Sequence, residues 1–97
     1  MMKKYELPLV LRAGEDIEPV KESVKAILQK HGAQIEAEDV WGTRKLAYEI
    51  DNEREGYYLI LILEVTPQAL EKITSEFRLN SDILRYLFIK IKETQKK

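Results

Sequence analysis

The chain has 97 residues, of which 44% are hydrophobic and 34% are charged, and its formal net charge is −1 at pH 7. A chain of this length normally builds one small core, so we expect a single domain over residues 1–97. Sixteen basic residues are balanced by 17 acidic ones, which excludes a broad basic surface for nucleic acid. Any RNA site must therefore be local or shared with a partner.

Cysteine is absent, which excludes a disulfide framework and thiolate metal sites, and we expect no cofactor. The apolar run near the N-terminus is short, is interrupted by Pro8 and lacks a small-residue cleavage site, so it does not resemble a secretory signal. Nothing approaches the roughly 20 apolar residues of a membrane span. We expect a cytoplasmic protein without membrane contact.

The first third of the chain predicts a strand followed by a helix. Residues 4–12 place Tyr5, Leu7, Leu9 and Leu11 at alternate positions, which predicts a strand with its odd positions inward. Residues 16–31 repeat apolar side chains at spacings of three and four, with a proline in the first turn and a glycine after the end. This pattern is typical of an amphipathic helix.

The middle of the chain predicts two neighbouring strands. Residues 33–51 form a long, acidic strand interrupted at Gly42, which suits a sheet edge with a bulge. There Trp41 would cover an apolar edge, and Arg44 and Lys45 would point to opposite faces. Residues 52–56, "NEREG", read as a turn, and residues 57–65 are almost continuously apolar, as in a central strand.

The last third predicts a second helix and a fourth strand. Thr66 caps the helix, Pro67 takes its first position and Asn80 ends it. Residues 82–92 form the strand, and the polar residues 93–97 should fray. The order strand, helix, strand, strand, helix, strand is that of the ferredoxin-like α+β fold, with an antiparallel four-stranded sheet and both helices on one face. The expected spatial order is fourth, first, third, second.

One face of such a sheet has no helix over it. If Leu59, Leu61 and Leu63 face the helices, alternate side chains of three strands form a contiguous apolar patch on the open face. A monomer seldom exposes such a patch without a partner. The predicted partner-binding residues are Val10, Tyr58, Ile60, Ile62, Leu87 and Ile89.

The sequence offers little to an enzyme or to a small-molecule substrate. His31, the one histidine, stands at a helix end, where it would interact with the helix dipole. The acidic residues Glu36, Glu38 and Asp39 have no His or Cys beside them and suit an edge strand. An alternative to a partner surface is stacking on single-stranded RNA, because Tyr57 and Tyr58 follow Gly56 as in an RNA-recognition motif. The first strand, however, has Pro8 or Val10 where a second aromatic residue is expected.

Four segments resemble the bacterial small-subunit ribosomal protein S6 family over residues 3 to about 92: "YELPLVLRAGED", "VWGTRKLAYEI", "GYYLILILEV" and "EFRLNSDILRYLFIK". The second is the most specific, with Gly42, Arg44, Leu46, Ala47, Tyr48 and Ile50 in the family's signature positions. The chain departs from the family at Glu49, where proline is frequent, and in its C-terminal tail, which is short.

The resemblance implies a structural protein of the small ribosomal subunit. Such a protein pairs with the basic ribosomal protein S18 and binds the central domain of the small-subunit ribosomal RNA. A near-neutral chain fits this role if a few of its own side chains contact phosphate. By position in the matching segments, the predicted RNA-binding residues are Lys3, Lys4, Tyr5, Arg44, Lys45, Arg78, Arg85, Lys90 and Lys92.

Overall fold

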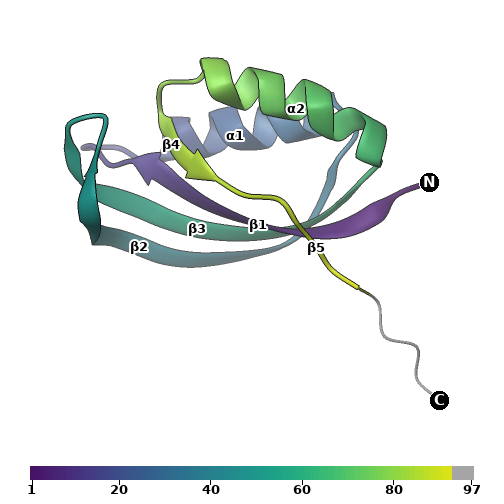
Figure 1. The fold of residues 1–97 in the computed structure, drawn as a ribbon, viewed down its shortest axis with the longest axis horizontal. Helices are drawn as coiled ribbons and strands as arrows, with labels where there is room; N and C mark the ends of the chain where they lie inside the picture. Colours follow the sequence, from purple (N-terminus) through teal and green to yellow (C-terminus); the bar gives the residue numbers. More distant parts are fainter. Residues whose placement is uncertain (93–97) are drawn as a thin grey trace.

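The architecture is an antiparallel sheet that carries two helices on one face (Figure 1). A computed structural model describes residues 1–92. The elements in chain order are β1 (Lys3–Arg12), α1 (Glu18–Lys30), β2 (Gln34–Ile50), β3 (Glu53–Val65), α2 (Pro67–Leu79), β4 (Ile83–Tyr86) and β5 (Ile89–Lys90). The strand order is β2-β3-β1-β4, and β5 also pairs with β1. The predicted ferredoxin-like arrangement and spatial order are confirmed.

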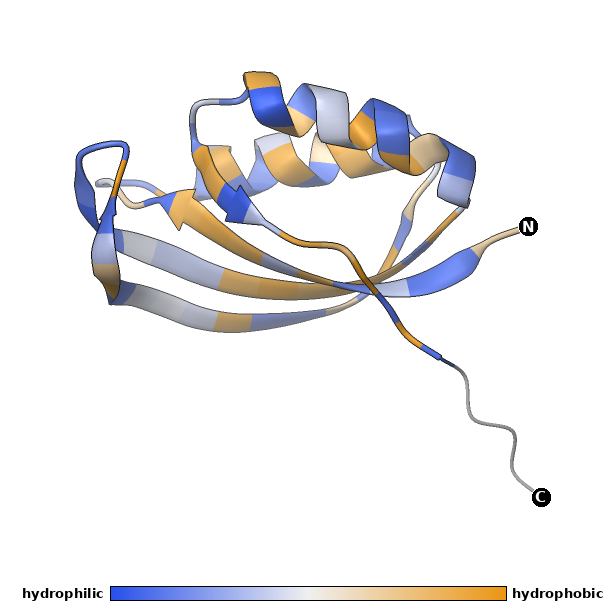
Figure 2. Cartoon of the chain, in the orientation of Figure 1, coloured by the Kyte–Doolittle hydropathy of each residue, from blue (hydrophilic) through white to orange (hydrophobic). Residues whose placement is uncertain are grey.

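The core lies between the sheet and the helices, and strand alternation selects its residues. The odd positions of β1 and β3 point toward the helices, and Leu7, Leu61 and Leu63 are fully buried. The helices contribute apolar side chains at helical spacing from α1 and from α2. Hydrophobic residues accordingly concentrate along the stretches of β1 and β3 that run beneath the helices (Figure 2). Both predicted parities are therefore confirmed.

Local signals explain where the helices begin and end. Proline stands at the start of both helices. The N–H groups of a first helical turn have no partner within the helix, so proline, which has no N–H, fits there without loss of a hydrogen bond. Gly32 follows α1 with φ +87°, a conformation that glycine adopts without strain. Thr66 occupies the N-cap of α2 as predicted, but its side chain makes no capping hydrogen bond. No described helix is long and apolar enough to cross a membrane.

The hairpin between β2 and β3 is tighter than predicted. Its turn consists of Asp51 and Asn52 alone, with φ of +49° and +65°, while Ile50 already pairs with Glu53. Two successive left-handed residues are the geometry of a two-residue hairpin turn, and Asp and Asn tolerate it better than most side chains. The prediction of a turn over 52–56 is wrong, because residues 53–56 belong to β3. Their polarity reflects a hairpin end that extends beyond the core.

The predicted fourth strand over 82–92 is divided into β4 and β5. The Pro8 carbonyl accepts a hydrogen bond from the Leu87 N–H at 3.2 Å. In an extended strand, the N–H and C=O of one residue point to the same side. An N–H at position 8 would therefore also point toward the segment that contains Leu87, but proline has none. β4 ends at Tyr86, and pairing resumes at Ile89. Pro8 therefore removes one ladder bond at the break.

The predicted fraying of 93–97 concerns residues outside the described part of the chain.

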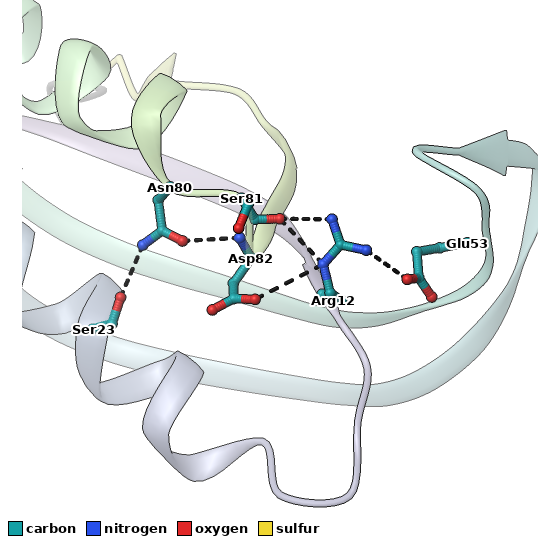
Figure 3. Close-up of polar contacts among 6 residues, drawn as sticks. All are labelled: Arg12, Ser23, Glu53, Asn80, Ser81 and Asp82. Carbon is teal, nitrogen blue, oxygen red and sulfur yellow. Dashed lines mark hydrogen bonds and ion pairs between the residues drawn. The ribbon is translucent and has the colours of Figure 1, made fainter.

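Arg12 ties the end of β1 to two distant segments (Figure 3). Its guanidinium donates to the carboxylate of Glu53 beside the hairpin turn and to the backbone carbonyl of Ser81 before β4. The Asp82 carboxylate lies 3.8 Å from Arg12 Nε. These contacts occupy Arg12 and fix the β2–β3 hairpin against the loop that follows α2.

Candidate partner and nucleic-acid interface

The open face of the sheet contains an apolar groove of about 440 Å³. Its floor comes from β1 and β3, where Tyr58 pairs with Val10 and Ile60 pairs with Pro8. Leu87 and Arg85 form the wall on the β4 side, and Trp41 of β2 lines the groove as well. Four predicted partner-binding residues thus lie together in one concave site: Val10, Tyr58, Ile60 and Leu87.

The other two predicted partner-binding residues are separated from each other. Glu6 of β1 pairs with Ile62 on one side and with Ile89 on the other. A half-buried carboxylate therefore interrupts the apolar surface between them. The expectation of one contiguous patch is wrong at this end of the sheet, because alternation along β1 brings Glu6 to the same face.

Trp41 is a groove residue that the partner-site prediction did not include. The ladder between β2 and β3 shifts register between Val40 and Gly42, and Gly42 has φ +84°. This confirms the predicted bulge, which adds one residue to β2. The Trp41 indole N–H donates to Asp39 Oδ2 at 3.0 Å, and its ring is half exposed. The isolated tryptophan beside a glycine was the signal available in the sequence.

The far end of the hairpin reaches across the open face to β4. The Tyr48 hydroxyl accepts a hydrogen bond from Arg85 Nη2 at 2.6 Å, and the Arg85 guanidinium lies 5.4 Å from the Tyr48 ring centre. A second cavity of about 180 Å³ lies here and shares Val10 and Tyr58 with the groove. Two strands separate β2 from β4, so this contact requires the strong twist of the hairpin.

Four of the predicted RNA-binding lysines gather near the N-terminus. β5 pairs with the start of β1, since Lys90 lies opposite Tyr5 and the Ile91 N–H donates to the Lys4 carbonyl at 2.9 Å. Lys4 also forms an ion pair with Glu36 at 3.3 Å. The residues that line the shallow cavity of about 320 Å³ at this place include Lys3, Lys4, Lys90, Lys92 and Glu64.

The remaining predicted RNA-binding residues are dispersed. Arg44 lies over the Trp41 ring at 5.6 Å, on the open face. Lys45, one residue further along β2, faces the other way, and Arg78 lies on α2 in the helical layer. Tyr5 is only 6% exposed and packs edge-on against Phe88 within the core. This burial fits the inward position predicted for Tyr5 and leaves little of its side chain for a contact with RNA.

The two tyrosines of the RNA-recognition alternative do not share a face. Tyr58 lines the open groove, whereas the ring of Tyr57 lies toward α1, with Lys21 Nζ 5.9 Å from its centre. Consecutive residues of a strand point to opposite faces, so both rings cannot stack on one RNA strand. The alternative thus loses one of its two rings.

His31 connects the two helices. It is the C-cap of α1, and its Nε2 lies 2.7 Å from Glu76 Oε2 of α2. Lys30 Nζ lies 2.9 Å from the same oxygen, and the hydrogen bonds from Lys30 and then His31 lower the pKa of Glu76. Within residues 1–92, no group of three or more His, Cys, Asp and Glu side chains could hold a metal ion.

Glu38 links β2 to α1 and makes stability depend on pH. Its carboxylate accepts from Lys25 Nζ at 2.8 Å and pairs with Lys21 Nζ at 3.0 Å. The hydrogen bonds from Lys25 and then Lys21 lower the pKa of Glu38 below its usual 4.5. The hydrogen bond to Glu38 raises the pKa of Lys21 above its usual 10.5. The stabilisation from Glu38 is therefore present above pH 4.5 and is lost as the pH falls through the lower, folded-state pKa.

We expect Glu38→Gln to lower the free energy of unfolding by about 0.5–1 kcal/mol at pH 7, since partly exposed ion pairs contribute little more. The difference from the wild type should shrink as the pH falls from 5 to 3. Urea unfolding at both limits measures it. Glu22→Gln is the control, because Glu22 lies on α1 without an ion pair to another described residue. A Glu38→Gln deficit that persists at pH 3 would contradict the electrostatic origin.

These features define a ferredoxin-like α+β domain whose sheet has one uncovered, grooved face. The chain belongs to the ribosomal protein S6 family, because the model of that family, "Ribosomal protein S6", matches residues 4–90. The small ribosomal subunit protein bS6 of Granulibacter bethesdensis is 33% identical over 95 residues. That match covers 95% of this chain and 62% of the relative, so the chain spans less than two thirds of the relative's length.

Solved structures confirm the fold. The crystal structure of 30S ribosomal protein S6 from Thermotoga maritima superposes with a TM-score of 0.82 at 24% identity, covering 94% of this chain and 89% of that one. A homoserine dehydrogenase from Thiobacillus denitrificans matches with a TM-score of 0.67 at 12% identity over 96% of this chain and 18% of that chain. At these identities the likeness concerns the fold alone.

Proposed function

We propose that the protein is a structural, non-catalytic component of the small ribosomal subunit. In this role it docks the basic ribosomal protein S18 on its open sheet face and contacts the central domain of the small-subunit ribosomal RNA with a limited set of cations. Family membership supports the ribosomal assignment. The groove supports the protein partner, because an apolar concavity on an uncovered face is stabilised when another protein removes it from water.

The charge distribution supports a shared RNA site. The net charge of −1 leaves no broad footprint for phosphates. Six of the predicted RNA-binding cations lie in two parts of the surface. One is the lysine group where β1 meets β5, and the other is the pair Arg44 and Arg85 on the open face. A partner that brings further positive charge beside these residues would complete the footprint.

We expect weak RNA binding by the isolated protein and tight binding by its complex with S18. Salt titration of binding to a central-domain fragment of the ribosomal RNA, with and without S18, measures both affinities. The slope of log K against log salt should be steeper for the complex than for the isolated protein. Each further phosphate that is neutralised steepens this slope by about 0.9, the value for duplex DNA. Tight binding that does not depend on S18 would overturn the shared site.

Ribosome association is tested separately by sedimentation of the native protein from cell extract. The protein should co-sediment with the small subunit and stay with it at moderate salt. A protein found only in the soluble fraction would overturn the proposed function as a whole.

A further inference from the structure

Two arginines on the open face carry charges that no carboxylate of residues 1–92 neutralises, unlike those of Lys4 and Arg12. Lys4 is paired with Glu36, and Arg12 with Glu53 and Asp82. Within residues 1–92, Arg44 and Arg85 have no carboxylate within ion-pair distance, and both are exposed. Their charges are therefore available to an anion from outside the described chain.

Each of these guanidiniums is held against an aromatic ring of β2. Arg44 lies 5.6 Å from the Trp41 ring centre and donates from Nε to the Trp41 carbonyl at 3.3 Å. Arg85 lies 5.4 Å from the Tyr48 ring centre and donates from Nη2 to the Tyr48 hydroxyl at 2.6 Å. One ring and one oxygen thus fix each side chain, while other guanidinium N–H groups remain without a partner in the described chain.

The two arginines lie on β2 and β4, which are separated by β3 and β1, the strands that form the floor of the groove. Arg85 belongs to β4 and lines the groove, whereas Arg44 belongs to β2 beside Trp41. A protein that covered the groove would leave both guanidiniums at its border, where exclusion of water strengthens a charged hydrogen bond. Fixing such a side chain beforehand reduces the ordering cost on binding.

We propose that Arg44 and Arg85 bind RNA phosphates at the border of the partner-covered groove, and that Trp41 and Tyr48 are positioning residues that hold the two guanidiniums for this contact. The inference rests on the proposed function. Phosphate is favoured over a carboxylate of the partner because the proposed partner is basic, whereas RNA offers a phosphate at every nucleotide. A guanidinium fork also matches phosphate oxygens in a bidentate manner.

The test uses the complex of the full chain with S18 and a central-domain RNA fragment. Arg85→Gln should weaken RNA binding roughly tenfold and reduce the salt slope by about one, as expected for one lost phosphate contact. Arg44→Gln should do the same. Lys72→Gln, an exposed cation on α2, is the matched control and should change neither.

The positioning role is tested by Tyr48→Phe, which keeps the ring and removes the hydroxyl that fixes Arg85. RNA binding should weaken about twofold to tenfold with the salt slope unchanged, because the cation is still present. In an Arg85→Gln background, Tyr48→Phe should have no further effect. Tyr48 is 60% exposed, so the melting temperature should stay near that of the wild type.

The outcomes separate the inference from the function on which it rests. If the wild-type complex binds no RNA, both fall. If it binds, but Arg85→Gln and Arg44→Gln leave the affinity and salt slope unchanged, only the inference falls. If these variants lose S18 instead of RNA, the arginines contact a carboxylate of the partner, and the phosphate assignment is wrong. Equal effects of Tyr48→Phe with and without Arg85 would overturn the positioning role.

Discussion

Replacing Ile60 by Asp should weaken the complex with the partner protein by about 3–5 kcal/mol, because a charge buried without a counter-charge is expensive. Ile60 lies in the floor of the groove, on the central strand β3. Apolar anchors at the centre of an interface carry much of its binding energy. Asp39 lies opposite Ile60 on β2, so the new carboxylate would also stand beside one of its own sign. Isothermal titration with S18 measures the loss.

Two companion variants identify the cause. Ile60→Asn introduces polarity without charge and should lose less affinity than Ile60→Asp. Leu61→Asp places the same charge one residue along, where the side chain is fully buried against the helices, and should unfold the free protein. Ile60→Asp should leave the free fold standing, with a loss of about 1 kcal/mol for a strand position that faces the open side. Full retention of S18 affinity in Ile60→Asp would place the partner elsewhere.

Replacing Phe77 by Ala should lower the free energy of unfolding by about 3–5 kcal/mol, the usual effect of removing a buried aromatic ring. Phe77 of α2 is 1% exposed and joins the helix layer to the fourth strand. Its ring centre lies 5.2 Å from that of Tyr86, in an edge contact, and 6.1 Å from that of Phe88, in a stacked one. Removing it would leave a cavity between α2 and the segment that carries Tyr86 and Phe88, and both rings would lose a partner.

Thermal unfolding measures this loss, and the melting temperature should fall by roughly 15–25 °C for a domain of this size. Leu79→Ala is the matched control. Leu79 lies two residues further on the same helix but is 86% exposed, so its replacement should change stability by no more than about 0.5 kcal/mol. Similar losses in the two variants would contradict the packing of α2 described above.

The sequence alone determined the features that depend on local periodicity. Alternation in β1 and β3 predicted which side chains enter the core, and the proline and glycine positions predicted the limits of the helices. The bulge at Gly42 and the opposite directions of Arg44 and Lys45 followed in the same way. These are properties of a few neighbouring residues, and strand geometry imposes them before any partner strand is chosen.

The tertiary structure decided what depends on strand pairing and twist. The polar residues 53–56 looked like a turn, but pairing with β2 makes them strand, and Pro8 divides the fourth strand from a position more than 70 residues away in sequence. Register also brings Glu6 between Ile62 and Ile89, and the twisted hairpin brings Tyr48 to Arg85. Such contacts join segments that are distant in the chain, so local patterns do not encode them. The groove, with Arg85 in its wall and Arg44 beside Trp41, exists only once the sheet has formed.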